Sequence, residues 1–127
     1  MKLLHTCLRV RDLKASLDFY INKLRMKEIR RIELPKGKAT LVFVGYDEKE
    51  GTIELTYNHG REEPYTIGDG FSHLAFAVDD VAKTYDSLVA QGVSSHRAPF
   101  RSETGGTLAF IKDPDGYSIE LVERKIP

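Results

Sequence analysis

The sequence predicts an α+β fold made of two βαβββ modules in tandem, with curved mixed sheets that form a cleft. Two observations support this prediction. Near the C-terminus, Pro114-Asp115-Gly116 is typical of a tight turn, and the residues after it alternate between apolar and polar as in a strand. The tripeptide Ile-Glu-Leu at 119–121 also occurs at 53–55, and the segments around it repeat as well. The fold therefore follows from one strand pattern and its recurrence.

The first module begins with a strand over residues 3–10, whose polar face carries His5, Cys7 and Arg9. Asp12 is then a candidate N-cap for an amphipathic helix that ends near Met26. Turn residues separate the segments that follow. The further strands are expected over residues 29–33, 39–46 and 52–57, with turns at 35–37 and 47–51.

The same pattern restarts after a segment without periodicity. Residues 59–70 contain Gly, Pro and charges, which indicates a linker. Beyond it, residues 72–81 align with 4–13, and residues 107–111 align with 40–44, at an offset of 66 to 68 residues. The chain is therefore expected to contain an internal duplication.

The second module carries helix boundaries of its own. Asp80 is a candidate N-cap, and Gly92 suits the end of the helix. Modules of this size bury little surface alone, so the two sheets are expected to share a core, within one chain or across a dimer. The domain prediction is one domain over residues 1–127, with repeats at about 1–58 and 71–127 joined by the linker 59–70.

Composition excludes several classes of partner. Nineteen basic residues balance 19 acidic ones, and no basic patch interleaved with aromatics indicates nucleic acid. No apolar stretch approaches the length of a membrane span or a signal peptide. The single cysteine, Cys7, fits a reducing compartment and is expected to be a small buried side chain. A soluble, cytoplasmic protein is expected.

The repeat places one histidine on the first strand and one glutamate on the last strand of each module. A lone histidine or glutamate on a strand is usually structural or exposed, but four at matching positions favour a metal site. Two imidazoles and two carboxylates neutralise a divalent cation and suit nickel, cobalt, zinc or iron, leaving two octahedral positions for water. The candidate ligands are His5, Glu54, His73 and Glu120.

Other polar residues lie close to these in the pattern. Arg9 shares a strand face with His5, and it is either an exposed surface charge or an anion contact beside the metal. Asn58 is either a turn residue at a strand end or a ligand contact. His59 in the linker and His96 in a polar loop are expected to be solvated.

The chain resembles bacterial glyoxalase I of the vicinal-oxygen-chelate superfamily nearly from end to end. The resemblance rests on these stretches: Leu4-His5-Thr6, Leu8-Arg9-Val10, Leu17-Asp18-Phe19-Tyr20, Phe43-Val44-Gly45-Tyr46, Ile53-Glu54-Leu55-Thr56-Tyr57-Asn58, His73-Leu74-Ala75, Ala109-Phe110-Ile111 and Asp113-Pro114-Asp115-Gly116-Tyr117. It implies a lactoylglutathione lyase that isomerises the hemithioacetal of methylglyoxal and glutathione to S-lactoylglutathione, in methylglyoxal detoxification.

The resemblance also implies roles for individual residues. His5 and Glu54 of one subunit of a homodimer would meet His73 and Glu120 of the other around Ni²⁺ or Co²⁺, with Zn²⁺ as an alternative. Glu120 would be the leading catalytic base, and Glu54 would serve the other hand of the substrate or assist reprotonation. Metal binding would acidify the C–H bond of the substrate and stabilise the ene-diolate.

Glutathione recognition departs from the family's pattern at one position. Arg9 and Asn58 match positions that contact the glutamyl part of glutathione. Thr104 replaces the lysine common in the family's late loop. We therefore expect Arg101, or Arg97 beside it, to supply the missing cation; otherwise another thiol is used.

Three other functions share parts of this pattern. A thiol transferase of the antibiotic-resistance type or an extradiol dioxygenase needs two histidines and one carboxylate, and Glu54 argues against both. A metal-free ligand-binding protein of the same superfamily has no need of four ligand-type residues in register. If the isolated protein contained no metal and bound its ligand in the presence of a chelator, the ligand-binding protein would be the favoured interpretation.

Overall fold

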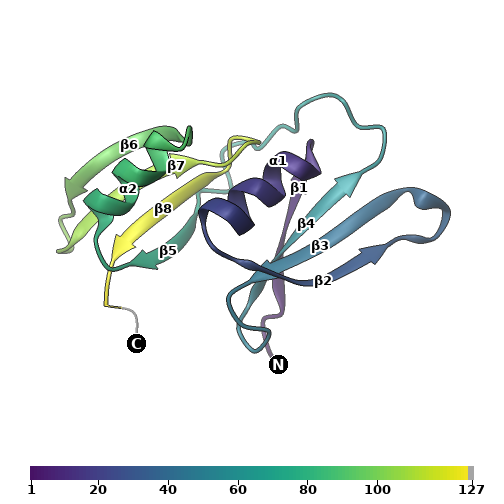
Figure 1. The fold of residues 1–127 in the computed structure, drawn as a ribbon, viewed down its shortest axis with the longest axis horizontal. Coiled ribbons are helices and arrows are strands. Elements are labelled where there is room, and N and C mark those ends of the chain that lie inside the picture. The colour runs from purple at the N-terminus through teal and green to yellow at the C-terminus, as the bar shows by residue number, and fades with distance from the viewer. Residues whose placement is uncertain (126–127) are drawn as a thin grey trace. The chain divides into compact units, whose positions relative to one another are not determined.

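Figure 1 presents a computed structural model that describes residues 1–125. The chain divides into two compact units, Met1–Thr66 and Ile67–Pro127, and the division falls inside the segment predicted as a linker. Each unit contains a four-stranded mixed sheet and runs in the order strand, helix, strand, strand, strand. The predicted α+β fold with two βαβββ modules is therefore confirmed.

The first unit has its strands in the order β1-β4-β3-β2. β1 is parallel to β4, and the other neighbouring strands are antiparallel. Helix α1 continues directly into a π-helical segment, η1, which ends at Lys23, before the predicted end near Met26. The elements are β1 His5–Val10, α1 Leu13–Leu17, η1 Asp18–Lys23, β2 Lys27–Glu33, the 3-10 turn η2 Pro35–Gly37, β3 Ala39–Gly45 and β4 Thr52–Asn58.

The second unit repeats this topology with the order β5-β8-β7-β6, in which β5 is parallel to β8. Figure 1 shows α2 lying across the sheet of its own unit. The elements are β5 Leu74–Val78, α2 Val81–Ala90, β6 Ser94–Arg101, β7 Thr107–Lys112 and β8 Ser118–Glu123.

Strand β6 corrects one expectation from the sequence. His96, predicted in a polar loop, lies on this strand, as do Arg97 and Arg101. β6 is an edge strand with an exposed face, and its pairing with β7 shifts register between Ser95 and Arg97 and again before Phe100. The shifts disrupt the alternation of buried and exposed residues by which a strand is recognised.

Both predicted N-caps are confirmed. The side chain of Asp12 accepts a hydrogen bond from the amide of Ala15 at 3.1 Å, and that of Asp80 accepts one from the amide of Lys83 at 2.9 Å. Each carboxylate satisfies an amide that has no partner inside its helix. The two helices are thus fixed at equivalent points after the first strand of their units.

The predicted turn before β8 is built around a buried carboxylate. Asp113 is 5% exposed and accepts hydrogen bonds from the amides of Asp115 and Tyr117, both at 2.9 Å. Gly116 has φ of +93°, in the left-handed region that favours glycine. Because this turn sets where β8 begins, it also sets which residues of the strand face the core.

The alternation predicted for β8 is confirmed. Ile119 and Leu121 are 0% and 1% exposed, whereas Glu120 between them lies on the partly exposed face. On β1, Leu8 and Val10 are buried, but Cys7 is exposed and not buried as predicted. Cys7 lies on the polar face of β1 with His5. Within residues 1–125 no helix is long and apolar enough to cross a membrane.

Candidate metal centre

Each unit brings together one predicted histidine and one predicted glutamate. In the first unit, Nε2 of His5 lies 3.3 Å from Oε1 of Glu54, and their side chains are 37% and 13% exposed. In the second unit, Nε2 of His73 lies 3.4 Å from Oε2 of Glu120, with exposures of 32% and 16%. We call each His–Glu pair a half-site. Both half-sites have nearly the same geometry, as the duplication predicts.

Strand register explains why the two half-sites match. Glu54 pairs with Cys7 of the parallel strand β1 on one side and with Phe43 of β3 on the other. Glu120 pairs with Ala75 of β5 and with Phe110 of β7 in the same way. Each glutamate therefore occupies the same position in its sheet.

A phenylalanine ring braces the histidine of each half-site. Phe43 contacts His5 edge-on with ring centroids 5.3 Å apart, and Phe110 contacts His73 at 5.5 Å. His73 lies immediately before β5, and its Nδ1 is 2.7 Å from the hydroxyl of Ser72. A partner on Nδ1 fixes the ring and leaves Nε2 available to a cation.

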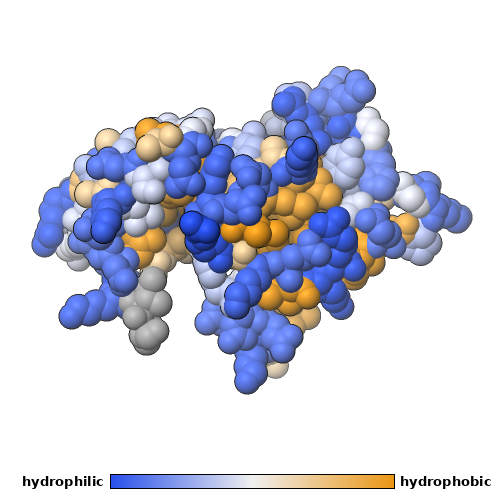
Figure 2. Space-filling model, in the orientation of Figure 1, coloured by the Kyte–Doolittle hydropathy of each residue, from blue (hydrophilic) through white to orange (hydrophobic). Residues whose placement is uncertain are grey.

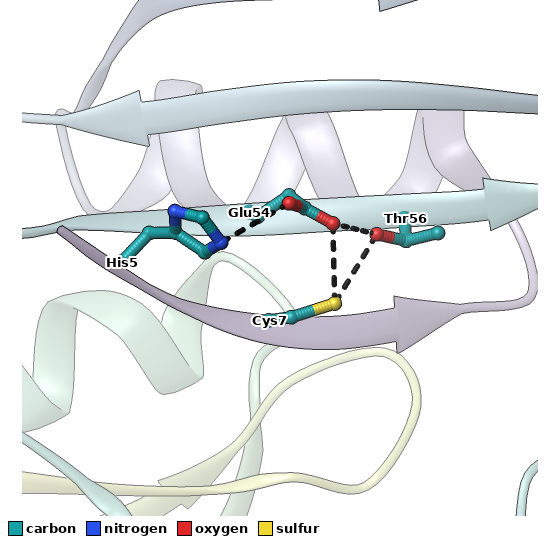
Figure 3. A network of polar contacts seen from close by, with 4 residues as sticks. All are labelled: His5, Cys7, Glu54 and Thr56. Carbon is teal, nitrogen blue, oxygen red and sulfur yellow. Dashed lines mark hydrogen bonds and ion pairs between the residues drawn. The ribbon is translucent and has the colours of Figure 1, made fainter. Parts of the chain in front are cut away.

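Glu54 has further partners that Figure 3 shows in detail. Its Oε2 accepts hydrogen bonds from the hydroxyl of Thr56 and, at 3.2 Å, from the thiol of Cys7. The thiol also lies 3.2 Å from the Thr56 hydroxyl. Desolvation of the thiol raises the pKa of Cys7 above its usual value, the largest of several influences on it. Oε1 alone faces His5.

Each half-site has donors that fit a divalent cation of borderline softness. Two donors that bind one such cation at about 2.0–2.2 Å lie about 3.0–3.5 Å apart at right-angled to tetrahedral geometry, and both His–Glu separations fall in that range. Within residues 1–125, no group of three or more His, Cys, Asp or Glu side chains is placed to hold a metal. Each unit by itself supplies only half of the predicted ligand set.

A cavity of about 600 Å³ adjoins the half-site of the second unit. Glu120 lines it together with Ala75 and Ala77, whose small side chains leave room above the sheet. Thr104 also lines it, and so does Arg124, which follows β8 on the same alternation as Glu120. Neither Arg97 nor Arg101 is among the described residues around this cavity.

The predicted substrate contacts lie at different places in their units. Arg9 is exposed on the face of β1 that carries His5, and Arg101 is exposed at the end of β6. Asn58 ends β4, and its amide donates to the hydroxyl of Tyr65 at 3.0 Å. Arg61 lies over the Tyr65 ring at 4.2 Å, which places a cation near Asn58.

The two other histidines are exposed but have partners. His59 contacts the hydroxyl of Thr40 at 2.8 Å, and Nδ1 of His96 lies 3.2 Å from the hydroxyl of Ser118. Ser118 is two residues before Glu120 on β8 and on the same strand face. His96 therefore contacts the strand that carries Glu120, and it does not lie in a separate loop.

Several residues of the site had no role in it predicted from the sequence: Phe43, Phe110, Cys7, Thr56 and Arg124. The repeat alignment already placed Phe43 over Phe110, and Thr56 lies two residues after Glu54 on the same strand face. Those two signals point to Phe43, Phe110 and Thr56, and the same alternation places Cys7 on the face of His5 and Arg124 on the face of Glu120.

Comparison with known proteins identifies the family of this chain. Residues 2–121 match the Glyoxalase/Bleomycin resistance protein/Dioxygenase superfamily. The chain therefore belongs to this superfamily. Among curated relatives, the lactoylglutathione lyases of Salmonella typhi and Neisseria meningitidis are each 45% identical over 98% of this chain, and the matches cover 94% and 92% of their own lengths.

Solved structures of glyoxalase I are also similar to this chain. The crystal structure of glyoxalase I from Zea mays superimposes with a TM-score of 0.91 and 37% identity over 98% of this chain, which spans 45% of the maize chain. The trypanothione-dependent glyoxalase I of Leishmania major gives a TM-score of 0.84 and 39% identity, with 96% of this chain and 86% of that one covered.

Proposed function

We propose that this protein is a metal-dependent lactoylglutathione lyase (glyoxalase I) that isomerises the hemithioacetal of methylglyoxal and glutathione to S-lactoylglutathione. The observation that carries the proposal is the pair of matched His–Glu half-sites, one in each unit. The similarity of this chain to lactoylglutathione lyases over nearly its full length supports the same activity. The role would be methylglyoxal detoxification in the cytoplasm.

The metal ligands in this proposal are His5, Glu54, His73 and Glu120, with Ni²⁺ or Co²⁺ as the cation and Zn²⁺ as the alternative. When bound, the cation would polarise the two adjacent substrate oxygens and stabilise the negative charge left by proton removal. The donor set of two nitrogens and two carboxylates supports a cation of this group over calcium or copper(I).

The side chains would divide the proton transfers between them. Glu120 would take the proton from the carbon next to sulfur and deliver it to the neighbouring carbon. Glu54 would serve the other hand of the hemithioacetal or assist reprotonation. The cavity beside Glu120, with Ala75 and Ala77 on its floor, supports substrate binding at that carboxylate. No redox cofactor is required because the reaction is an isomerisation.

A homodimer would complete the ligand set. Each unit supplies two of the four ligands, so His5 and Glu54 of one copy would join His73 and Glu120 of a second copy. Exposed apolar residues favour association: Leu3 and Leu4, beside His5, are 78% and 65% exposed. Figure 2 shows further apolar side chains gathered beside α1 on the surface of the first unit.

The proposed thiol is glutathione. Arg9 and Asn58 would contact its glutamyl part, and the Arg61 guanidinium near Asn58 adds positive charge there. Arg101 remains the predicted contact for the glycyl carboxylate, and Arg124 is a second candidate because it lines the cavity with Glu120. The Leishmania relative is described as trypanothione-dependent, so the thiol needs a direct test.

The activity is tested with chelator-stripped protein. Methylglyoxal and glutathione are added, and thioester absorbance is followed before and after resupply of Ni²⁺, Co²⁺ or Zn²⁺. We expect no turnover without metal and restored turnover with Ni²⁺ or Co²⁺ exceeding that with Zn²⁺. Folded protein that is inactive with every metal would exclude the glutathione-dependent lyase.

Arg124→Ala and Arg101→Ala decide which cation recognises the thiol. Loss of a charge-assisted contact to a carboxylate is expected to raise KM for the hemithioacetal by about tenfold with little change in kcat, because the contact is equal in ground and transition states. Steady-state kinetics with glutathione and with a thiol lacking the glycyl carboxylate measures this effect. A variant that keeps wild-type KM excludes its arginine, and Lys125→Ala, beyond the strand, is the matched control.

A further inference from the structure

The two half-sites differ in how their carboxylates are held. Cys7 and Thr56 both donate to Oε2 of Glu54, while Oε1 faces His5. Figure 3 shows that the two donors approach the same oxygen from adjacent strands, β1 and β4. One oxygen of Glu54 is thereby occupied by protein donors, and the other is left for a cation.

The second unit has no donor at either matching position. Ala75 pairs with Glu120 as Cys7 pairs with Glu54, and Val122 follows Glu120 as Thr56 follows Glu54. Neither a methyl nor an isopropyl side chain can donate a hydrogen bond. These two positions therefore leave Glu120 without the hydrogen bonds that hold Glu54.

We propose that Cys7 and Thr56 are positioning residues that hold Glu54 as a fixed ligand. Of the two roles given to Glu54 above, only assistance in reprotonation would then remain, and Glu120 is the carboxylate free to move and take the proton. If a carboxylate ligand moved toward a substrate carbon, hydrogen bonds to its other oxygen would be stretched or broken. Glu54 would give up its hydrogen bonds from Cys7 and Thr56, whereas Glu120 receives none from Ala75 or Val122. This inference rests on the proposed function, because it assigns unequal roles within that site.

The first experiment measures metal binding without turnover. In Cys7→Ala/Thr56→Val, the first half-site receives the residues of the second half-site. Outer partners of metal ligands are typically worth 10–100-fold in affinity, so we expect about tenfold weaker Co²⁺ binding in competition with a chromophoric chelator. The visible spectrum of bound Co²⁺ should change as well. Thr56→Ser keeps the hydroxyl and should retain both affinity and spectrum.

The second experiment transfers the pair to the other unit. Ala75→Cys/Val122→Thr places a thiol and a hydroxyl beside Glu120 in the same register. We expect kcat to fall about tenfold, with KM and Co²⁺ affinity kept or improved, because Glu120 is then held in place. Val122→Ala, which changes the side chain at position 122 without adding a donor, is the control and should keep kcat.

Two results would overturn the inference. One is unchanged Co²⁺ affinity and spectrum in Cys7→Ala/Thr56→Val. The other is unchanged kcat in Ala75→Cys/Val122→Thr that folds and binds metal. Failure of the proposed function has a different signature, which is absence of turnover in metal-loaded wild-type protein while the binding experiment still reports on Glu54.

Discussion

Glu120→Gln is expected to lower kcat by about 10²–10⁴-fold, the contribution of a positioned general base. Gln keeps the size of Glu120 and one oxygen that can face a cation, but it cannot accept the proton. Glu120 lies 3.4 Å from His73 and lines the cavity of its unit. Glu123 also lines this cavity, but its Oε1 accepts a hydrogen bond from the amide of Val81. Stopped-flow or steady-state absorbance of the thioester measures the loss.

The fall in kcat of Glu120→Gln must be distinguished from a loss of bound metal. Bound Ni²⁺ per chain, measured by elemental analysis, should remain above half of the wild-type value, and Glu103→Gln in the exposed turn after β6 should behave as wild type. Glu54→Gln should reduce kcat less than Glu120→Gln. A metal-loaded Glu120→Gln enzyme within threefold of wild-type kcat would remove Glu120 as the base.

Two inactive double variants are expected to restore activity when they share one dimer. His5→Ala/Glu54→Ala lacks one half-site, and His73→Ala/Glu120→Ala lacks the other. If each site combines half-sites of two copies, a mixed dimer holds one intact site of two and has about half of wild-type activity. Each variant alone should be inactive, because two ligands are missing from every site.

Mixed dimers are obtained by co-expression with two affinity tags and purification through both. Activity and bound Ni²⁺ are then measured on the doubly tagged species, with doubly tagged wild type as the reference. An inactive, metal-free mixed dimer would show that both half-sites of a site come from one chain. Failure to recover any doubly tagged species, including wild type, would contradict the homodimer.

Local and periodic features of this protein were determined by the sequence alone. Period-two alternation predicted that Glu120 faces away from the core residues Ile119 and Leu121, and the N-caps Asp12 and Asp80 were visible as residue types before apolar periodicity. The duplication predicted that the His–Glu pairs would have matching geometry. Such features depend on a few neighbouring residues, so the sequence is sufficient to predict them.

Contacts between distant strands were decided by the tertiary structure. Cys7 is 47 residues from Glu54, and it reaches Oε2 only because parallel β1 and β4 pair in one particular register. That register depends on the packing of the whole unit. A shift of one residue would turn the side chains of β1 to the other face, so no local pattern fixes this contact.

Edge strand β6 and the exposure of Cys7 differ from the expectations for separate reasons. β6 lacks clean alternation because its register shifts against β7, so its pairing with β7, and not its side-chain pattern, identifies it as a strand. Cys7 was expected to be buried by residue type, yet strand alternation placed it with His5 on the polar face. Residue type and periodicity predict the elements, whereas the difference between Glu54 and Glu120 arises only when the strands pair.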